Sequence, residues 1–194
     1  MRAFPIVAAL VLMGAIGVVL YVRGTDPRPV AAEMRARLTE ASAGLKAVDP
    51  AEHGFAMLIG AYEDAAAGMG RVALDYVSDI DIHDFAERLA EAPEIAARLG
   101  EGRDGGAETF DGFGAIHAEA QAELADGIAH IGTPDEIFVR TMLALYGGSV
   151  AIAETALAEG TDAALQPVAE DIVLLNKSAI GSMNRWLADN NHAH

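Results

Sequence analysis

Methionine and histidine are the residues of this chain whose side chains could bind a soft metal ion. Thioethers and imidazoles are donors that suit Cu(I), and His53 precedes Met57 by four residues, the spacing of one helix face. The candidate ligands are His53, Met57, His117, Met142 and Met183. Methionines on an apolar stripe also fill protein cores, and we favour that interpretation. The sequence therefore predicts no cofactor, with copper as the alternative.

A second group of polar side chains shares one face of a predicted helix. Glu123, Asp126 and His130 follow one another at i, i+3 and i+7. A carboxylate di-metal centre in a helical bundle takes Glu-x-x-His motifs from two helices, whereas this chain supplies one such face. A solvated surface is the favoured interpretation. His192 and His194 stand at the chain terminus, where disorder is the default.

The sequence lacks the motifs of the common catalytic sites. It contains no cysteine, no Gly-x-Ser-x-Gly elbow and no His-Glu-x-x-His motif. The glycine-rich run at 100–106, GEGRDGG, has neither a strand before it nor the Lys-Ser/Thr pair that a phosphate loop requires. We therefore expect a protein that is not an enzyme.

Two copies of one 20-residue helix dominate the chain and must position these side chains. They cover Phe55–Leu74 and Phe138–Leu157, and in both the apolar residues follow the 4-3-4-3-4 spacing of one helix face. The predicted core positions are Phe55, Ile59, Tyr62, Ala66, Met69 and Ala73 in the first copy, and Phe138, Met142, Leu145, Ser149, Ile152 and Ala156 in the second. Asp49-Pro50-Ala51-Glu52 and Thr133-Pro134-Asp135-Glu136 each resemble a capping box before a first-turn proline.

The remaining segments also read as helices or connectors. We assign 24–48 to a linker and first helix, 49–99 to the first repeat, 100–107 to a glycine-rich connector, 108–189 to the second repeat and 190–194 to a disordered tail. The last helix carries a stripe of Leu165, Val168, Ile172, Leu175, Ala179, Met183 and Trp186. No segment alternates like a strand, so the sequence predicts an all-α protein, most simply an up-and-down four-helix bundle with extra helices. We expect Trp186 and Met183 to pack against both repeat helices.

The N-terminus, residues 1–23, predicts a membrane anchor. Ala3 to Val22 is apolar and uncharged, and 20 helical residues span about 30 Å, the thickness of the hydrocarbon core. A cleaved signal peptide is the weaker alternative, because its apolar core is usually about 7–15 residues long. The arginines after residue 22 favour a cytoplasmic domain. The two-residue basic lead before the apolar segment favours export, and we expect a single-pass inner-membrane protein with its soluble domain in the periplasm.

The part of the chain after residue 24 is strongly acidic. It holds all 29 acidic residues against 11 basic ones, the chain's 13 without Arg2 and Arg23, and so carries a formal charge of −18. Such a surface is typical of a soluble domain and repels nucleic acid. Without cysteine, the domain depends on its core and has no disulfide.

The second repeat and last helix resemble a bacterial family known as domain of unknown function 305. That family has the pattern Phe-x-x-x-Met-Ile-x-His-His-x-x-Ala-x-x-Met-Ala-x-x-x-Leu, and a later helix with Gln-x-x-Glu-Ile-x-x-Met-x-x-Trp-Leu. The matching residues are Phe138, Met142, Leu143, Ala153, Leu157, Ile180, Met183, Trp186 and Leu187, and Ile116-His117 is similar to an upstream Met-His pair. The resemblance covers roughly 113–188, with a fainter copy at 49–76.

The resemblance implies a ferritin-like bundle, usually exported, in a family with some copper- or silver-binding members. The family's two histidines fall on Leu145 and Tyr146 in the second repeat, and on Tyr62 and Glu63 in the first. We therefore expect a degenerate metal site and an interaction or scaffold role, with the membrane and a protein as partners. A periplasmic copper-handling protein that uses methionine and histidine ligands is the alternative function.

Overall fold

The computed structural model describes residues 27–91 and 109–190, which form seven α-helices and no strand. The helices are α2 Pro27–Ala41, α3 Ala43–Lys46, α4 Phe55–Ala73, α5 Ile80–Glu91, α7 Phe113–Ala129, α8 Pro134–Glu159 and α9 Gln166–Asn190. The all-α prediction is confirmed for this part of the chain. The predicted anchor, the glycine-rich connector and the terminal histidines lie outside the described residues.

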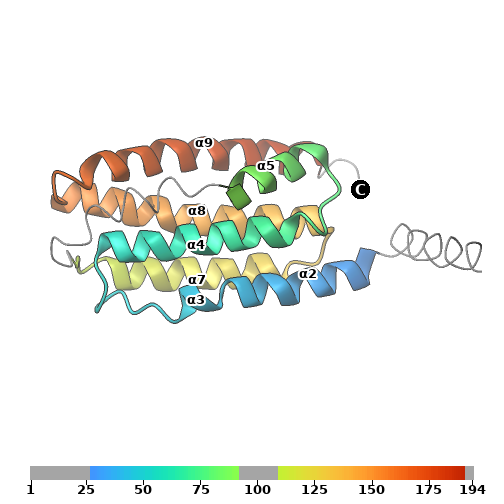
Figure 1. Cartoon of the computed structure of the whole chain (residues 1–194), viewed down its shortest axis with the longest axis horizontal. Helices are drawn as coiled ribbons and strands as arrows, with labels where there is room; N and C mark the ends of the chain where they lie inside the picture. The colour runs from blue at the N-terminus through green and yellow to red at the C-terminus, as the bar shows by residue number, and fades with distance from the viewer. Residues whose placement is uncertain (1–26, 92–108, 191–194) are drawn as a thin grey trace, which may run out of the picture.

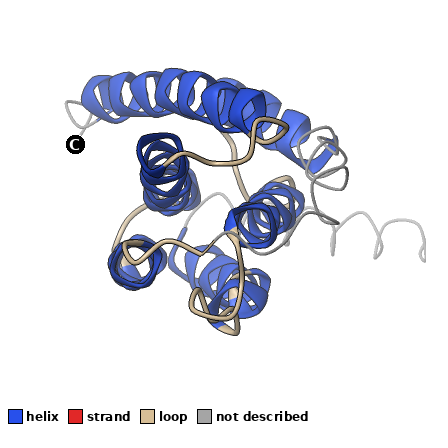
Figure 2. Cartoon of the chain, turned by 90° about the vertical axis from the view of Figure 1, so that its left-hand side faces the viewer, coloured by secondary structure: helices blue, strands red, loops and turns tan. Residues whose placement is uncertain are grey.

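Four helices, α2, α4, α7 and α8, form a bundle in which neighbours run antiparallel (Figures 1 and 2). α8 is the central element, since it packs against α2, α4, α7 and α9. The predicted up-and-down order is wrong in one respect. α4 and α7 run in the same direction (Figure 1), because α5 turns back along α4 and returns the chain toward the end where α4 began.

Each repeat helix occupies the same place in a three-helix unit. α4 follows the antiparallel α2 and precedes α5, just as α8 follows the antiparallel α7 and precedes α9. All twelve predicted core positions of the two repeat helices are buried. The two helices therefore hold similar places in the helix order and bury the faces that their spacing predicts.

The two copies begin differently. Thr133 accepts a hydrogen bond from the backbone of Glu136, whose carboxylate accepts the Thr133 N–H in return, so the predicted capping box of α8 is confirmed. The predicted cap of the first copy is wrong. Asp49 accepts the N–H of Ala51 and closes a separate turn, and α4 begins at Phe55 after an extended Gly54.

Glycines allow the closest helix approaches. A Cβ on Gly148 of α8 would lie 2.5 Å from the Cβ of Ala120 on α7 and 2.9 Å from Cε1 of Tyr62 on α4. A Cβ on Gly127 would lie 2.9 Å from the backbone nitrogen of Thr141. These distances are well below the 3.5–4.0 Å of an ordinary carbon contact. α8 therefore touches its neighbours through backbone at these points.

The last helix departs most from its prediction. α9 lies along the outside of α8 (Figure 1), and α2, with Met34 and Leu38 fully buried, completes the four-helix bundle. Leu175 is 55% exposed, and the adjacent Asn176 is buried and donates to the Ser149 hydroxyl at 3.2 Å. At this point the residue that faces α8 is therefore Asn176, and not the predicted Leu175.

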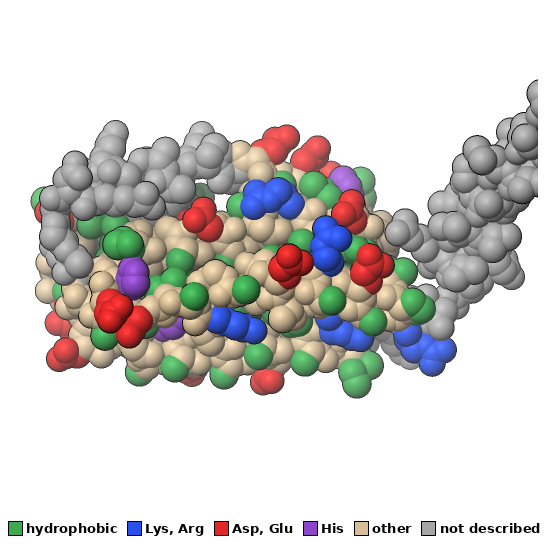
Figure 3. All heavy atoms as spheres, turned by 60° about the horizontal axis from the view of Figure 1, so that its bottom comes forward, with side chains coloured by type: hydrophobic (Ala, Val, Ile, Leu, Met, Phe, Trp, Pro, Cys, Tyr) green, Lys and Arg blue, Asp and Glu red, His purple; other side chains and the backbone are tan. Residues whose placement is uncertain are grey.

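The exterior is charged and mixed in sign. Figure 3 shows the face that lies at the bottom of Figure 1. On this face, acidic and basic side chains are interspersed with single apolar ones. Within the described residues, α8 is the helix that is long and apolar enough to cross a membrane, but 72% of its apolar window is buried inside the bundle. Burial of this kind is typical of the core helix of a bundle.

Candidate functional site

A hydrogen-bonded tyrosine–histidine pair lies inside the four-helix bundle. The hydroxyl of Tyr62 on α4 is 3.1 Å from Nδ1 of His117 on α7, and the two rings meet edge to face with centroids 5.8 Å apart. Both residues are buried. Burial raises the pKa of Tyr62 and lowers the pKa of His117, while a hydrogen bond to the backbone of Leu45 opposes the shift at His117. The pair is therefore neutral near pH 7.

The Tyr62 hydroxyl occupies Nδ1 of His117. This nitrogen is therefore engaged in a hydrogen bond and is not free to bind a metal ion. The two side chains meet from helices at opposite corners of the bundle, beside the close approach of Gly148.

The five predicted metal candidates lie in different surroundings. His53 lies before α4, not on it, and its Nδ1 is 2.8 Å from the Asp49 carbonyl oxygen. Met57 is 49% exposed, whereas Met142 and Met183 are buried in the core. His117 is held by Tyr62. Among the described residues no group of three or more His, Asp or Glu side chains is placed to hold a metal ion.

The Glu123, Asp126 and His130 face lies over a hollow at the α7–α8 boundary, which Arg140 also lines. Both carboxylates are exposed, as expected of a solvated face. Burial and the charge of Arg140 lower the pKa of His130. A permanent cation at this place opposes the binding of a second one.

Glu63 and the buried Tyr146 form a second polar cluster between α4 and α8. Burial, followed by the charge of Asp64, raises the pKa of Glu63 to about 7. Burial raises the pKa of Tyr146, and the charge of Glu63 adds to the shift while Arg88 opposes it. Tyr146 also packs edge to face on Phe85, with ring centroids 6.2 Å apart. The half-buried carboxyl group of Glu63, where α4, α5 and α8 meet, therefore has a pKa close to neutral pH.

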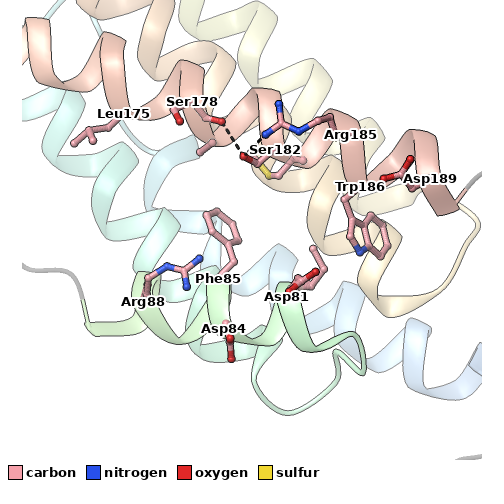
Figure 4. Close-up of a pocket in the computed structure, with 13 residues that line it drawn as sticks. Asp81, Asp84, Phe85, Arg88, Leu175, Ser178, Ser182, Arg185, Trp186 and Asp189 are labelled. Atoms are coloured by element: carbon pink, nitrogen blue, oxygen red, sulfur yellow. Dashed lines mark hydrogen bonds between the residues drawn. The ribbon is translucent and has the colours of Figure 1, made fainter.

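A groove with a volume of about 580 Å³ opens between α5 and α9 (Figure 4). Its floor is apolar, with Ile82 and Phe85 from α5 and Leu175 and Met183 from α9. Charged side chains stand on both walls. Trp186, expected in the core, is half-buried at one end of this groove, and its indole Nε1 is buried without a hydrogen-bond partner.

Sequence reasoning missed the groove because its walls come from helices that are far apart in the chain. On the α5 wall, Phe85 also packs on Phe138 of α8 at a centroid distance of 6.1 Å. The available signal was the pair of neighbouring leucines, Leu174 and Leu175. Both are more than half exposed.

Comparisons with protein-family models, with curated proteins and with solved structures find no match to this chain. The site geometry therefore carries the functional argument.

Proposed function

We propose that this chain is a non-enzymatic, membrane-anchored and exported helical-bundle protein that acts by binding a protein partner. The observation that carries the proposal is the Tyr62–His117 pair, because it occupies the bundle interior with a neutral, mutually satisfied hydrogen bond. The groove between α5 and α9 supplies the surface for a partner. In this proposal the interior contributes stability and the exterior contributes binding.

The proposal includes descent from a ferritin-like metal-binding bundle. Two helical hairpins joined by a long crossover are a hallmark of ferritin-like bundles, and the parallel α4 and α7 fit that connection. Tyr62 and Leu145, at the positions of family histidines, are both buried. Tyr62 meets His117, which resembles the histidine of the family's upstream Met-His pair. The former ligand positions are thus filled by packing and by one hydrogen bond.

A copper titration tests the choice between this function and metal handling. The full-length chain is loaded with Cu(I) in competition with a Cu(I) chelator, and we expect the chelator to keep the metal at micromolar copper. Stoichiometric copper that is lost on Met142→Leu and Met183→Leu substitution would reject the proposal in favour of the copper-handling alternative.

A reporter fusion tests the proposed location. Alkaline phosphatase fused after His194 folds only outside the cytoplasm, so we expect an active fusion. An inactive fusion, together with an active cytoplasmic reporter at the same point, would place the domain in the cytoplasm. The arginines after residue 22 would then determine the orientation, and not the short basic segment before the apolar run.

A further inference from the structure

The charges of the groove between α5 and α9 are ordered along its length. Trp186 lies at one end with Asp81 and Asp189 beside it, and Arg88 stands at the other end (Figure 4). Asp81 and Arg88 are seven residues apart on α5, which corresponds to about 10 Å along a helix. The apolar floor lies between these two ends. A ligand that matches this order has a cation and an anion about 10 Å apart with apolar groups between them.

We propose that this groove binds an amphipathic helix of a partner protein, with a basic residue at i, apolar residues at i+3 and i+4, and an acidic residue at i+7. The inference rests on the proposed interaction function and specifies the kind of helix that a partner protein presents to this groove. The walls are two helices whose backbones are internally bonded, so they offer no free edge to a strand. A third helix matches their side-chain spacing, because its positions i and i+7 are also about 10 Å apart on one face.

The acidic end suits a basic side chain. A lysine or arginine over an indole ring is attracted by the ring's π-electrons, and the carboxylates of Asp81 and Asp189 add charge attraction.

The basic end suits a carboxylate. Arg88 is exposed, and among the described residues no carboxylate forms an ion pair with it. Arginine binds carboxylates through two parallel hydrogen bonds. Asp84 points away from the groove floor, and Arg185 donates to the Ser182 hydroxyl at 3.0 Å (Figure 4). Arg185 keeps its charge at the Trp186 end, so that end holds the two carboxylates of Asp81 and Asp189 against one guanidinium.

The α9 wall allows close approach. Ser178, Ala179 and Ser182 face the groove between Leu175 and Met183, and small side chains let a third helix lie near the α9 backbone. Leu175 is 55% exposed at the Arg88 end. The partner's apolar residues would cover it together with Phe85.

Trp186 reports on this groove directly, because it is the single tryptophan of the chain. Three synthetic 14-residue amphipathic peptides share two central leucines and differ at positions i and i+7, which are Lys and Glu, Lys and Lys, or Glu and Glu. Each is titrated into the full-length chain while Trp186 fluorescence is followed. We expect the Lys–Glu peptide to bind best, with roughly a two- to fivefold loss for each wrong charge, the usual effect of an exposed ion pair.

A charge reversal separates specific binding from general attraction to an acidic protein. Arg88→Glu should reverse the preference, so that the Lys–Lys peptide binds better than the Lys–Glu peptide. The matched control is Arg37→Glu, an exposed arginine on α2 that makes the same change in net charge and should leave the order of the three peptides unchanged. Circular dichroism at 222 nm confirms that both variants are folded.

Three results would overturn the inference. Trp186 fluorescence could be insensitive to all three peptides, or the wild-type affinities could follow peptide charge alone. A concentration-dependent shift of Trp186 fluorescence without any peptide would instead assign the groove to a second copy of this chain. The copper titration is read independently of these signals, so failure of the groove inference and failure of the proposed function can be told apart.

Discussion

Gly148→Ala offers a direct test of how α4, α7 and α8 meet. The added Cβ would lie 2.5 Å from the Cβ of Ala120 and 2.9 Å from Cε1 of Tyr62, so the helices must separate by about 1 Å to restore ordinary contact. Overpacking of this kind costs about 1–3 kcal/mol. Alanine at the adjacent Gly147 meets no atom within 4 Å, and there the better helix propensity should stabilise the fold by up to about 1 kcal/mol.

The two variants have the same chemistry on neighbouring residues of one helix, and we expect their unfolding free energies to differ by about 1–4 kcal/mol. For a chain of this size that difference separates their melting temperatures by on the order of 2–15 °C. Urea and thermal unfolding of the full-length chain, followed by circular dichroism, measure it. Ala120→Gly should partly rescue Gly148→Ala, since Ala120 is the nearest obstacle. Equal stability of the Gly147 and Gly148 variants would refute the close approach of the three helices.

Three further predictions concern buried polar groups. The pKa of Glu63 is raised from 4.5 to about 7 in the folded state, so folding favours the protonated carboxyl; stability should fall by about 1–3 kcal/mol as the pH rises from about 4.5 to 7, and Glu63→Gln should remove that slope in urea titrations. Tyr62→Phe leaves Nδ1 of His117 without its donor and should cost about 1–3 kcal/mol at pH 7, whereas a loss below about 0.5 kcal/mol would mean that water replaces the hydroxyl. Asp135→Ala removes the acceptor of three hydrogen bonds, which come from the Ser78 N–H, the Ser78 hydroxyl and the Asp79 N–H. We expect a loss of about 2–4 kcal/mol in unfolding free energy and fast hydrogen exchange at the Ser78 amide. Continued protection of the Ser78 amide would contradict this role.

The periodicity of the sequence was sufficient to predict the buried faces of both repeat helices. Phe55 and Phe138 begin stripes that repeat every three or four residues over five turns, and such a signal depends only on the geometry of a helix. The end of α8 was also predictable, because helices often end at a glycine in the left-handed conformation. Gly160 has this conformation, with a φ of 93°. These features are local, so the neighbouring residues contain the information that determines them.

The features that were missed depend on contacts between distant segments. Asp49 was assigned as a helix cap because its local pattern is the same as that of Thr133. In the structure Asp49 closes a separate turn, and the extended Gly54 separates that turn from α4. The outward position of α9 depends on the buried Asn176–Ser149 pair, 27 residues apart in sequence. The Tyr62–His117 pair was beyond local reasoning, because its two residues are 55 positions apart and no periodicity relates them.

The central place of α8 has a consequence for how the chain is made. A helix of 26 residues with mean hydropathy 1.3 in its apolar window resembles a membrane span to any machinery that reads hydropathy alone. Three of the helices that bury it, α2, α4 and α7, precede it in the chain and one, α9, follows. Because synthesis proceeds from the N-terminus, a receptive apolar groove can be ready when α8 emerges. The order of helices along the gene thus protects α8 from mistaken delivery to the bilayer.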